Sequence, residues 1–325
     1  MKAIIYTQYG SPDVLQLKEI PKPFPGNDEV LVKIDAAAAN PLDWHFMRAS
    51  PFIIRFISGL LKPKNQILGA DIAGQIEAIG TNIKNFQAGD KVYGEISRGG
   101  FAEYVCVTED KLVLKPVNLS FEKAAAVPVA GLTALQCLRD QGHVQPEQKV
   151  LINGASGGVG TFAVQIAKSL GAKVTGVCST QNVDMVRSIG ADRVIDYTSE
   201  DFTQNDQRYD LILDNVGNRS VSEIKRILAS NGTYLLNAYS PALMLQLIFR
   251  SGGSKTGGQI MRNTDVTKAN QKDLEFLKAL LEAGKIVSVI DRVYPLSEVA
   301  EAIGYLEEGH ARGKVVITLE NSNKT

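Results

Sequence analysis

A short apolar segment that breaks into glycines and continues as a helix constrains this chain more than any other stretch. Lys149 to Asn153 reads as a strand, and Gly154 to Gly160 is a glycine-rich turn. Thr161 to Leu170 carries apolar residues at helical spacing, and Lys173 to Cys178 reads as a second buried strand. This strand, turn, helix and strand over roughly 30 residues form the smallest piece of a parallel sheet.

Glycines at such a turn have three physical roles. They allow a tight reversal, let backbone N–H groups approach a pyrophosphate, and let the helix pack closely on the strand. The start of the helix then presents unpaired donors and a partial positive charge to the phosphates. Here an alanine holds the first position of the pattern Ala155-x-Gly157-x-x-Gly160. The context predicts dinucleotide binding; the alternative is a tight turn in a sheet protein that binds no nucleotide.

The residues after the second strand bear on the choice between NAD and NADP. They are Ser179-Thr180-Gln181-Asn182, without a carboxylate. An Asp or Glu at this place would accept hydrogen bonds from the ribose 2′-OH of NAD. Two hydroxyl groups can instead donate to a 2′-phosphate, so the sequence favours NADP. No Lys or Arg stands in the turn itself, and the nearest is Arg187.

The overall charge balance predicts that neither nucleic acid nor a membrane is a partner. Thirty-five Lys and Arg balance thirty-five Asp and Glu, so no net field draws the chain to nucleic acid or to an anionic membrane. Residues Met1 to Tyr6 contain no long apolar run of the secretory type. The three cysteines are scattered in apolar contexts, which predicts reduced thiols and a cytoplasmic location.

The segment pattern changes along the chain. Residues 1–120 contain short β-like segments separated by Gly and Pro, which predicts an antiparallel β domain. Residues 121–263 alternate strands and helices, which predicts a doubly wound parallel sheet. Residues 264–325 add two further helices and two strands. The expected fold class is therefore α/β, a doubly wound parallel sheet plus an antiparallel β domain.

For two stretches the sequence leaves two alternative structural roles open. Pro51 to Leu61 is too apolar for an idle loop; it is either a core-facing helix or the wall of a substrate pocket or interface. Ser240 to Asn263 is a long glycine-rich connection, which is either a lid over a substrate or a solvent-exposed segment.

Several short motifs stand in a characteristic order along the chain. They are Ala38-Ala39-Asn40-Pro41-Leu42-Asp43-Trp44, Leu68-Gly69-Ala70-Asp71, Gly89-Asp90-Lys91-Val92-Tyr93-Gly94, Ala130-Gly131-Leu132-Thr133-Ala134, Ala155 to Gly160, Gly190-Ala191-Asp192 and Arg312-Gly313-Lys314-Val315-Val316. In these motifs the chain resembles the medium-chain dehydrogenase/reductase superfamily, in its zinc-free quinone oxidoreductase-like branch. The resemblance implies a GroES-like catalytic domain at 1–120, completed by the segment 264–325, with a Rossmann nucleotide-binding domain at 121–263 between them. It also implies a homodimer.

The zinc-containing relatives differ from this chain at their metal ligands. They carry Gly-His-Glu where this chain has Gly69-Ala70-Asp71, and a cysteine where it has Ala39-Asn40. They also carry a structural lobe with four cysteines, which three cysteines cannot supply. The three histidines lack zinc-ligand spacing. We therefore expect no zinc.

Without a metal, hydride transfer needs an acceptor that is electrophilic on its own, as quinones and α,β-unsaturated carbonyls are. The resemblance implies an NADPH-dependent reductase of quinones, enals or enones. The alternative is an NADP(H)-binding redox sensor or structural protein with little turnover.

The resemblance also implies roles for single residues. Asn40 and Asp43 line the nicotinamide end and Thr133 touches the nicotinamide amide. The cofactor contacts are Ser156, Gly157, Gly158, Val159 and Gly160 at the pyrophosphate, Ser179, Thr180 and Tyr197 at the 2′-phosphate, and Asn215, Val216, Leu236 and Arg312 along the ribose and nicotinamide. Four of these have simpler interpretations: Asp43 as a helix cap, Thr133 as an interior hydroxyl bonded to its own backbone, Tyr197 as strand-end packing and Arg312 as a solvated turn residue.

Overall fold

The computed structural model describes residues 1–244, 247 and 258–319. The chain forms two compact units. Unit 1 comprises Met1–Val129, Ala269–Glu282 and Ser288–Thr325, and unit 2 comprises Ala130–Lys268 and Ala283–Val287. The chain thus leaves unit 1, builds unit 2 and returns.

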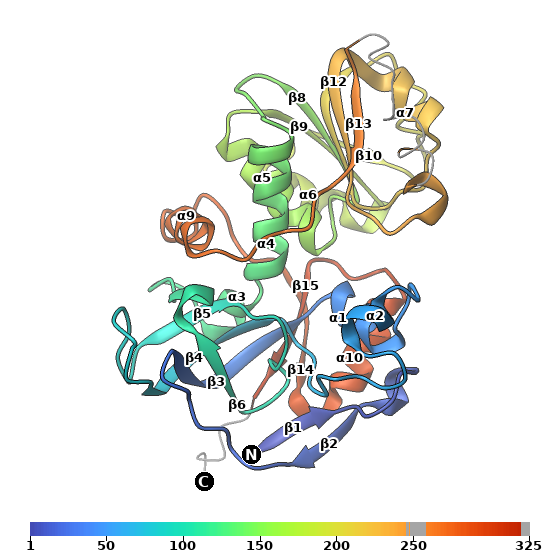
Figure 1. The fold of residues 1–325 in the computed structure, drawn as a ribbon. Helices are drawn as coiled ribbons and strands as arrows, with labels where there is room; N and C mark the ends of the chain where they lie inside the picture. Colours follow the sequence, from blue (N-terminus) through green and yellow to red (C-terminus); the bar gives the residue numbers. More distant parts are fainter. Residues whose placement is uncertain (245–246, 248–257, 320–325) are drawn as a thin grey trace. The chain divides into compact units, whose positions relative to one another are not determined.

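Unit 2 is built on a parallel sheet whose strands lie in the order β10-β9-β8-β11-β12-β13 (Figure 1). Each neighbouring pair is parallel. The order reverses between β8 and β11, the switch point at which doubly wound sheets bind their ligands. The bounds are β8 Lys149–Asn153, β9 Lys173–Cys178, β10 Arg193–Asp196, β11 Tyr209–Asp214, β12 Leu228–Leu236 and β13 Ile260–Asn263.

Helices pack on this sheet because their apolar residues recur every three or four positions. In α5, Gly158–Ser169, the residues Phe162, Ile166 and Ala167 are fully buried, and α5 contacts β8 and β9. The remaining helical segments are α4 Pro128–Leu135, which begins in unit 1, the π-helix η3 Gln136–Gln141, the short turn η4 Thr180–Asn182, α6 Val183–Ser188 and α7 Val221–Ile227.

Unit 1 contains a mixed sheet in the order β14-β15-β3-β4-β5-β7, with β6 also paired to β3, and a separate β1-β2 ribbon. All pairs are antiparallel except β14 with β15. The strands are β1 Lys2–Ile5, β2 Gln16–Glu19, β3 Glu29–Ala39, β4 Asp71–Ile79, β5 Lys91–Glu95, β6 Tyr104–Thr108, β7 Leu112–Leu114, β14 Ile290–Pro295 and β15 Lys314–Thr318. The helical segments are η1 Pro12–Val14, α1 Pro41–Arg48, α2 Ile54–Ser58, η2 Glu109–Lys111, α3 Phe121–Ala125, α9 Gln271–Glu282, η5 Leu296–Glu298 and α10 Val299–Glu307.

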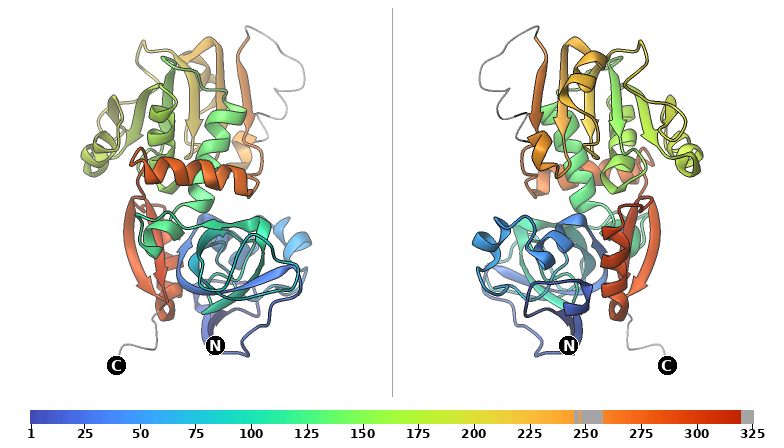
Figure 2. Two further views of the ribbon diagram at one scale, coloured as in Figure 1. Left: turned by 90° about the vertical axis from the view of Figure 1, so that its left-hand side faces the viewer. Right: turned by 90° about the vertical axis from the view of Figure 1, so that its right-hand side faces the viewer.

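The C-terminal strands complete unit 1. β15 pairs with β3 on one side and β14 on the other, and Figure 2 shows the red C-terminal part of unit 1 beside its blue N-terminal part. Ala36–Ala39 of β3 are all buried, and their small side chains allow close approach of the neighbouring elements. Val299 and Ile303 of α10 join the same apolar core.

The predicted α/β class, with a doubly wound parallel sheet and a second, mainly antiparallel β domain, is confirmed. The predicted limits of 120 and 263 differ from the unit boundaries. Unit 1 continues to Val129 because α3 packs on β3 and β4 and because Asp71 Oδ1 accepts the Val129 N–H at 2.8 Å. Ala283–Val287 belong to unit 2, where Val287 exchanges hydrogen bonds with Gln165.

Two sequence interpretations need correction. Ile260–Asn263, assigned to a loop, forms β13 and pairs with β12; the strand is short and follows a glycine-rich run, so it has no readable alternation. Of the two alternatives left open for Pro51–Leu61, the core-facing helix is wrong, because only Ile54–Ser58 is helical and most of the large apolar side chains of the segment are exposed. Residues 245–246 and 248–257 of the predicted lid segment lie outside the described residues.

Within the described ranges, no helix has the length and apolar character that a membrane span requires.

Candidate functional site

The glycine turn of unit 2 lies between β8 and α5, at the carboxyl end of the sheet. Gly154 has φ +75°, and a Cβ on Gly160 would lie 2.0 Å from the Gly154 carbonyl oxygen. Gly160 is therefore required for the contact between helix and strand. At Gly157 a Cβ would meet only the Gly154 oxygen, at 3.6 Å, so the protein itself leaves room there. The first N–H groups of α5, at Gly158, Val159 and Gly160, have no acceptor within their own helix.

A polar network fills the switch point beside this turn. Asn153 ends β8 and donates from Nδ2 to Asp214 Oδ1, at the end of β11, at 2.8 Å. The Tyr234 hydroxyl donates to Asp214 Oδ2 at 2.9 Å, and the N–H groups of Val216 and Gly217 donate to Oδ1. Asp214 is fully buried, so this carboxylate fixes the loop that follows β11.

The predicted contacts Asn215, Val216 and Leu236 follow the same strand ends. Asn215 donates from Nδ2 to the Asn153 carbonyl at 3.1 Å and accepts from Asn237 at 2.8 Å. Val216 is 46% exposed, whereas Leu236 is buried in the core of unit 2. The structure places Asn215 and Val216 in the loop that follows β11, at the carboxyl end of the sheet, and the Leu236 side chain packs in the core of unit 2.

The end of β9 carries the predicted 2′-phosphate residues. The Ser179 hydroxyl accepts from Asn182 Nδ2 at 3.0 Å, which leaves its proton available to an acceptor. Thr180 instead donates to Asp196 Oδ2 at 2.6 Å. Asp196 ends β10, and the hydrogen bonds from Thr180 and Thr198 lower the pKa of its carboxyl group. The Asp196 carboxylate thus lies beside the expected position of the 2′-phosphate. The sequence analysis did not predict this.

Tyr197 lies next to this position, because its N–H donates to the Cys178 carbonyl at 3.0 Å. Its side chain is half-exposed, so the Tyr197 ring is not packed in the core. Ser156 also adjoins this end of β9, since its hydroxyl accepts from Asn182 at 3.3 Å.

Thr133 is buried in α4, where its hydroxyl lies 3.0 Å from that of Thr267. The interaction links the helix to the segment after β13, so its hydroxyl does not bond solely to its own backbone.

A second polar cluster lies at the meeting of β3, β4 and β15 in unit 1. The Lys314 ammonium donates to Asn40 Oδ1 and to Asp71 Oδ2, the latter at 3.0 Å. Asn40 Nδ2 donates to the same Asp71 oxygen at 3.0 Å. All three side chains are buried. The structure therefore contains a buried ion pair, Lys314 with Asp71, that the sequence analysis missed. The only signal in the sequence is that Lys314 stands at the start of an apolar strand.

Asp43 lies against this cluster and binds backbone. It accepts the Asn40 N–H at 2.8 Å, as the third residue of α1 in a capping box with Asn40, and the Gly69 N–H at 2.9 Å. Burial raises the pKa of Asp43 to about 7, although both N–H groups favour the carboxylate. The contacts of Asp43 within unit 1 therefore agree with the simpler interpretation, in which this side chain caps the start of a helix.

Arg312 is exposed on the turn before β15, where its N–H donates to Asp291 at 2.9 Å. This is the position of a surface turn residue.

The donor set at the Asn40 cluster does not suit zinc. Ala39 and Ala70 offer no ligand atom, and the side chains of Asn40 and Asp71 already bind an ammonium ion. In the described portion of the chain, no three His, Cys, Asp or Glu side chains lie close enough together to hold a metal ion.

Glu95, near this ion pair, gives the stability of unit 1 a measurable pH dependence. Burial, and then the charge of Asp71, raise the pKa of Glu95 to about 7, above its ordinary value of 4.5. The folded state therefore binds this proton more tightly than the unfolded state, and stability falls as the pH rises from about 5 through 7. We expect Glu95→Gln to reduce this loss by about 2 kcal/mol, since one pKa unit corresponds to about 1.4 kcal/mol and solvent screens part of the shift.

Urea unfolding at pH 5 and pH 8, followed by the fluorescence of the single tryptophan, Trp44 in unit 1, measures this difference. Glu308→Gln, at an exposed position, is the control. If the free energy of unfolding changed with pH in the same way in wild type and Glu95→Gln, a raised pKa of Glu95 would not be the cause of the loss of stability.

Comparison with known proteins agrees with both units. Residues 26–117 match the alcohol dehydrogenase GroES-like domain, and residues 189–317 match a family described as zinc-binding dehydrogenase. The structure of the quinone oxidoreductase from Coxiella burnetii superimposes with a TM-score of 0.86 at 32% identity, covering 98% of this chain and 99% of that one.

Two curated relatives span the chain. The chloroplast envelope quinone oxidoreductase homolog of Arabidopsis thaliana is 33% identical over 98% of both chains. The chloroplastic NADPH-dependent alkenal/one oxidoreductase of the same plant is 34% identical over 98% of this chain and 79% of its own length. The chain therefore belongs to the medium-chain dehydrogenase/reductase superfamily, in its quinone oxidoreductase-like branch.

These relatives correct the predicted cytoplasmic location. Both are named as chloroplast proteins, and a further relative, an NAD(P)H oxidoreductase of Bos taurus, is named as mitochondrial. The prediction used reduced cysteines and the lack of a secretory signal. Neither feature separates the cytosol from the interior of an organelle, so the cytoplasmic assignment was wrong.

Proposed function

We propose that this protein is an oxidoreductase that transfers a hydride from NADPH to a quinone or to an α,β-unsaturated carbonyl compound. The observation that carries the proposal is the glycine turn at the switch point of unit 2, with space at Gly157 and unpaired N–H groups at the start of α5. The names of the relatives, quinone oxidoreductase and NADPH-dependent alkenal/one oxidoreductase, support the choice of cofactor and acceptor.

When bound, NADPH supplies the hydride, and the residues of the chain supply position and electrostatics. We assign the pyrophosphate to Ser156, Gly157, Gly158, Val159 and Gly160. Asn215 and Val216 follow along the crevice, and the Thr133 hydroxyl serves the nicotinamide amide. Asn40 and Asp43 have their polar atoms bound within unit 1, so we assign them to positioning. The Lys314 ammonium holds Asn40 and Asp71 where the zinc-containing relatives bind their metal, which supports a metal-free reaction.

The test is the absorbance of NADPH mixed with a panel of quinones, enals and enones. Oxidation by at least one class of acceptor is expected, and the rate should not change after treatment with a zinc chelator. Tight NADPH binding without oxidation by any acceptor would favour the redox sensor. The homodimer implied by the family resemblance stays a prediction, which light scattering tests.

The choice between NADPH and NADH depends on the end of β9. We expect Ser179→Asp to lower the ratio of kcat/KM for NADPH over NADH by at least about tenfold, because a carboxylate repels the 2′-phosphate and accepts the 2′-OH of NADH. Asp196→Asn is expected to raise the same ratio, since it removes the existing carboxylate beside Thr180.

Steady-state kinetics with both cofactors measure the two ratios. Asp184→Asn, an exposed position on α6, is the control for a change of charge. If both substitutions left the ratio unchanged, the 2′-phosphate would not lie at this strand end.

A further inference from the structure

The segment around α2 exposes a group of large apolar side chains. Six of them are 55–87% exposed. Single exposed apolar residues are ordinary on protein surfaces, whereas six within ten positions form a patch of the kind that marks an interaction site. We call this group the α2 patch, and it consists of Phe52, Ile53, Phe56, Ile57, Leu60 and Leu61.

Only basic charges accompany the α2 patch along the chain. From Trp44 to Ala70 the sequence contains Arg48, Arg55, Lys62 and Lys64 and no Asp or Glu. Arg48 is compensated by Glu307. In the ranges 1–244 and 258–319, no ion pair involves Lys62 or Lys64. The patch is thus apolar with a net positive border.

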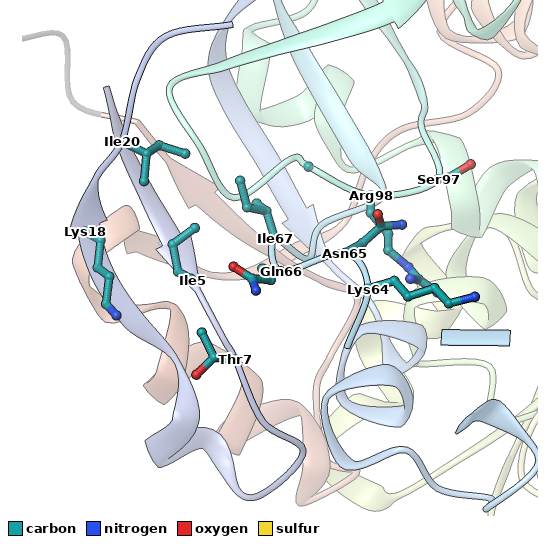
Figure 3. Close-up of a pocket in the computed structure, with 11 residues that line it drawn as sticks. Ile5, Thr7, Lys18, Ile20, Lys64, Asn65, Gln66, Ile67, Ser97 and Arg98 are labelled. Carbon is teal, nitrogen blue, oxygen red and sulfur yellow. The ribbon is translucent and has the colours of Figure 1, made fainter. Parts of the chain in front are cut away.

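A cavity of about 680 Å³ adjoins this border within unit 1 (Figure 3). Its charged lining residues are Lys18, Lys64 and Arg98, with no carboxylate, and the isoleucines Ile5, Ile20 and Ile67 also line it. Two contacts join the cavity to α2. Arg98 donates to the Ser58 hydroxyl at 3.2 Å, and the Lys64 N–H donates to the Ser58 carbonyl at 2.7 Å. Lys64 therefore belongs both to the basic border of the α2 patch and to the lining of the cavity.

We propose that this face of unit 1 docks on a lipid bilayer that contains anionic headgroups. The α2 patch enters the boundary between headgroups and acyl chains, while Lys62 and Lys64 pair with lipid phosphates and the cationic cavity receives a headgroup. Apolar side chains bordered by Lys and Arg have the composition of interfacial membrane anchors. The balanced charge of the whole chain does not oppose this docking, because attraction to a surface falls off within about 8 Å at physiological ionic strength and so depends on local charge.

The charges near the α2 patch also favour a bilayer over a second copy of the chain as its partner. A symmetric contact would bring the same patch of both copies together. It would place Lys62 and Lys64 of one copy near those of the other, without any carboxylate from residues 44–70 to compensate them. An anionic surface compensates them fully, so it is the complementary occupant.

Flotation with vesicles tests the proposal without cofactor or turnover. Wild type is expected to float with vesicles of phosphatidylcholine and phosphatidylglycerol, to remain unbound with phosphatidylcholine alone, and to be released by high salt. Phe56→Asp/Ile57→Asp and Lys62→Glu/Lys64→Glu should each weaken binding by at least about tenfold, because both change apolar insertion or local charge. The matched controls are Phe24→Asp, at a side chain that is 90% exposed elsewhere in unit 1, and Lys84→Glu, also exposed.

Circular dichroism and thermal melting of each variant show that the fold is retained. Equal flotation of wild type and both double variants would overturn the proposal. The proposal would also be overturned if the double variants were monomeric by light scattering, wild type were a dimer, and vesicle binding were unchanged. That result would show that the α2 patch contacts a second copy of the chain. A loss of kcat/KM for a water-soluble quinone without any change in flotation would assign it to the acceptor site and would equally overturn membrane docking.

Discussion

Replacing Lys314 with methionine is expected to destabilise unit 1 by about 3–5 kcal/mol, because it leaves the carboxylate of Asp71 buried without its cation. Lys314 and Asp71 are both almost completely buried, 3.0 Å apart. Asn40 loses its contact with the ammonium in the same variant. Urea unfolding followed by Trp44 fluorescence gives the free energy of unfolding of unit 1.

Two further variants test whether the loss of stability in Lys314→Met comes from the uncompensated charge of Asp71. Lys314→Met/Asp71→Asn should recover much of the loss, because the uncompensated charge is then absent. Lys285→Met changes an exposed lysine and should have little effect. If Lys314→Met alone were as stable as wild type, the ammonium would not be what balances the buried carboxylate.

Gly157→Val is expected to weaken NADPH binding by at least about 100-fold, because the side chain would occupy the space where phosphate meets the N–H groups of α5, and two charge-assisted hydrogen bonds would be lost. The fold should persist, since a Cβ at Gly157 meets only the Gly154 oxygen at 3.6 Å, an ordinary contact. Isothermal titration with NADPH measures the affinity, and circular dichroism monitors the fold.

Gly160→Ala is the structural counterpart of that substitution. Its Cβ would lie 2.0 Å from the Gly154 oxygen and 2.8 Å from the Ala155 Cα, so it should lower the stability of unit 2 as well as binding. Gly157→Ala should give an intermediate loss of affinity with unchanged stability. Unaltered NADPH affinity in Gly157→Val would remove the phosphate site from this turn.

The sequence predicted the parallel sheet because periodicity and glycine placement are local properties. The strand from Lys149, the turn and α5 lie where these patterns place them. The buried polar pair Asn153 and Asp214 could have been found in the same way, because each is the polar residue that ends an apolar strand.

What the sequence could not supply are contacts between distant segments. Lys314 is 243 positions from Asp71, and no local pattern pairs them. Asp196 reaches Thr180 only because β10 and β9 are neighbours in the sheet. The sequence left open whether the α2 patch faces the core or forms the wall of a pocket or interface, because apolar composition does not show which elements remain to cover it.

The position of β15 affects the order in which the protein can fold during translation. This strand lies inside the sheet of unit 1, between β14 and β3, yet the ribosome makes it after all of unit 2. Until it emerges, the nascent sheet has an unpaired edge along Ala36–Ala39 of β3, and the Asp71 carboxylate must stay hydrated. Unit 2 can fold in that interval, since domains commonly fold as they leave the ribosome. The sheet that begins first is therefore completed last.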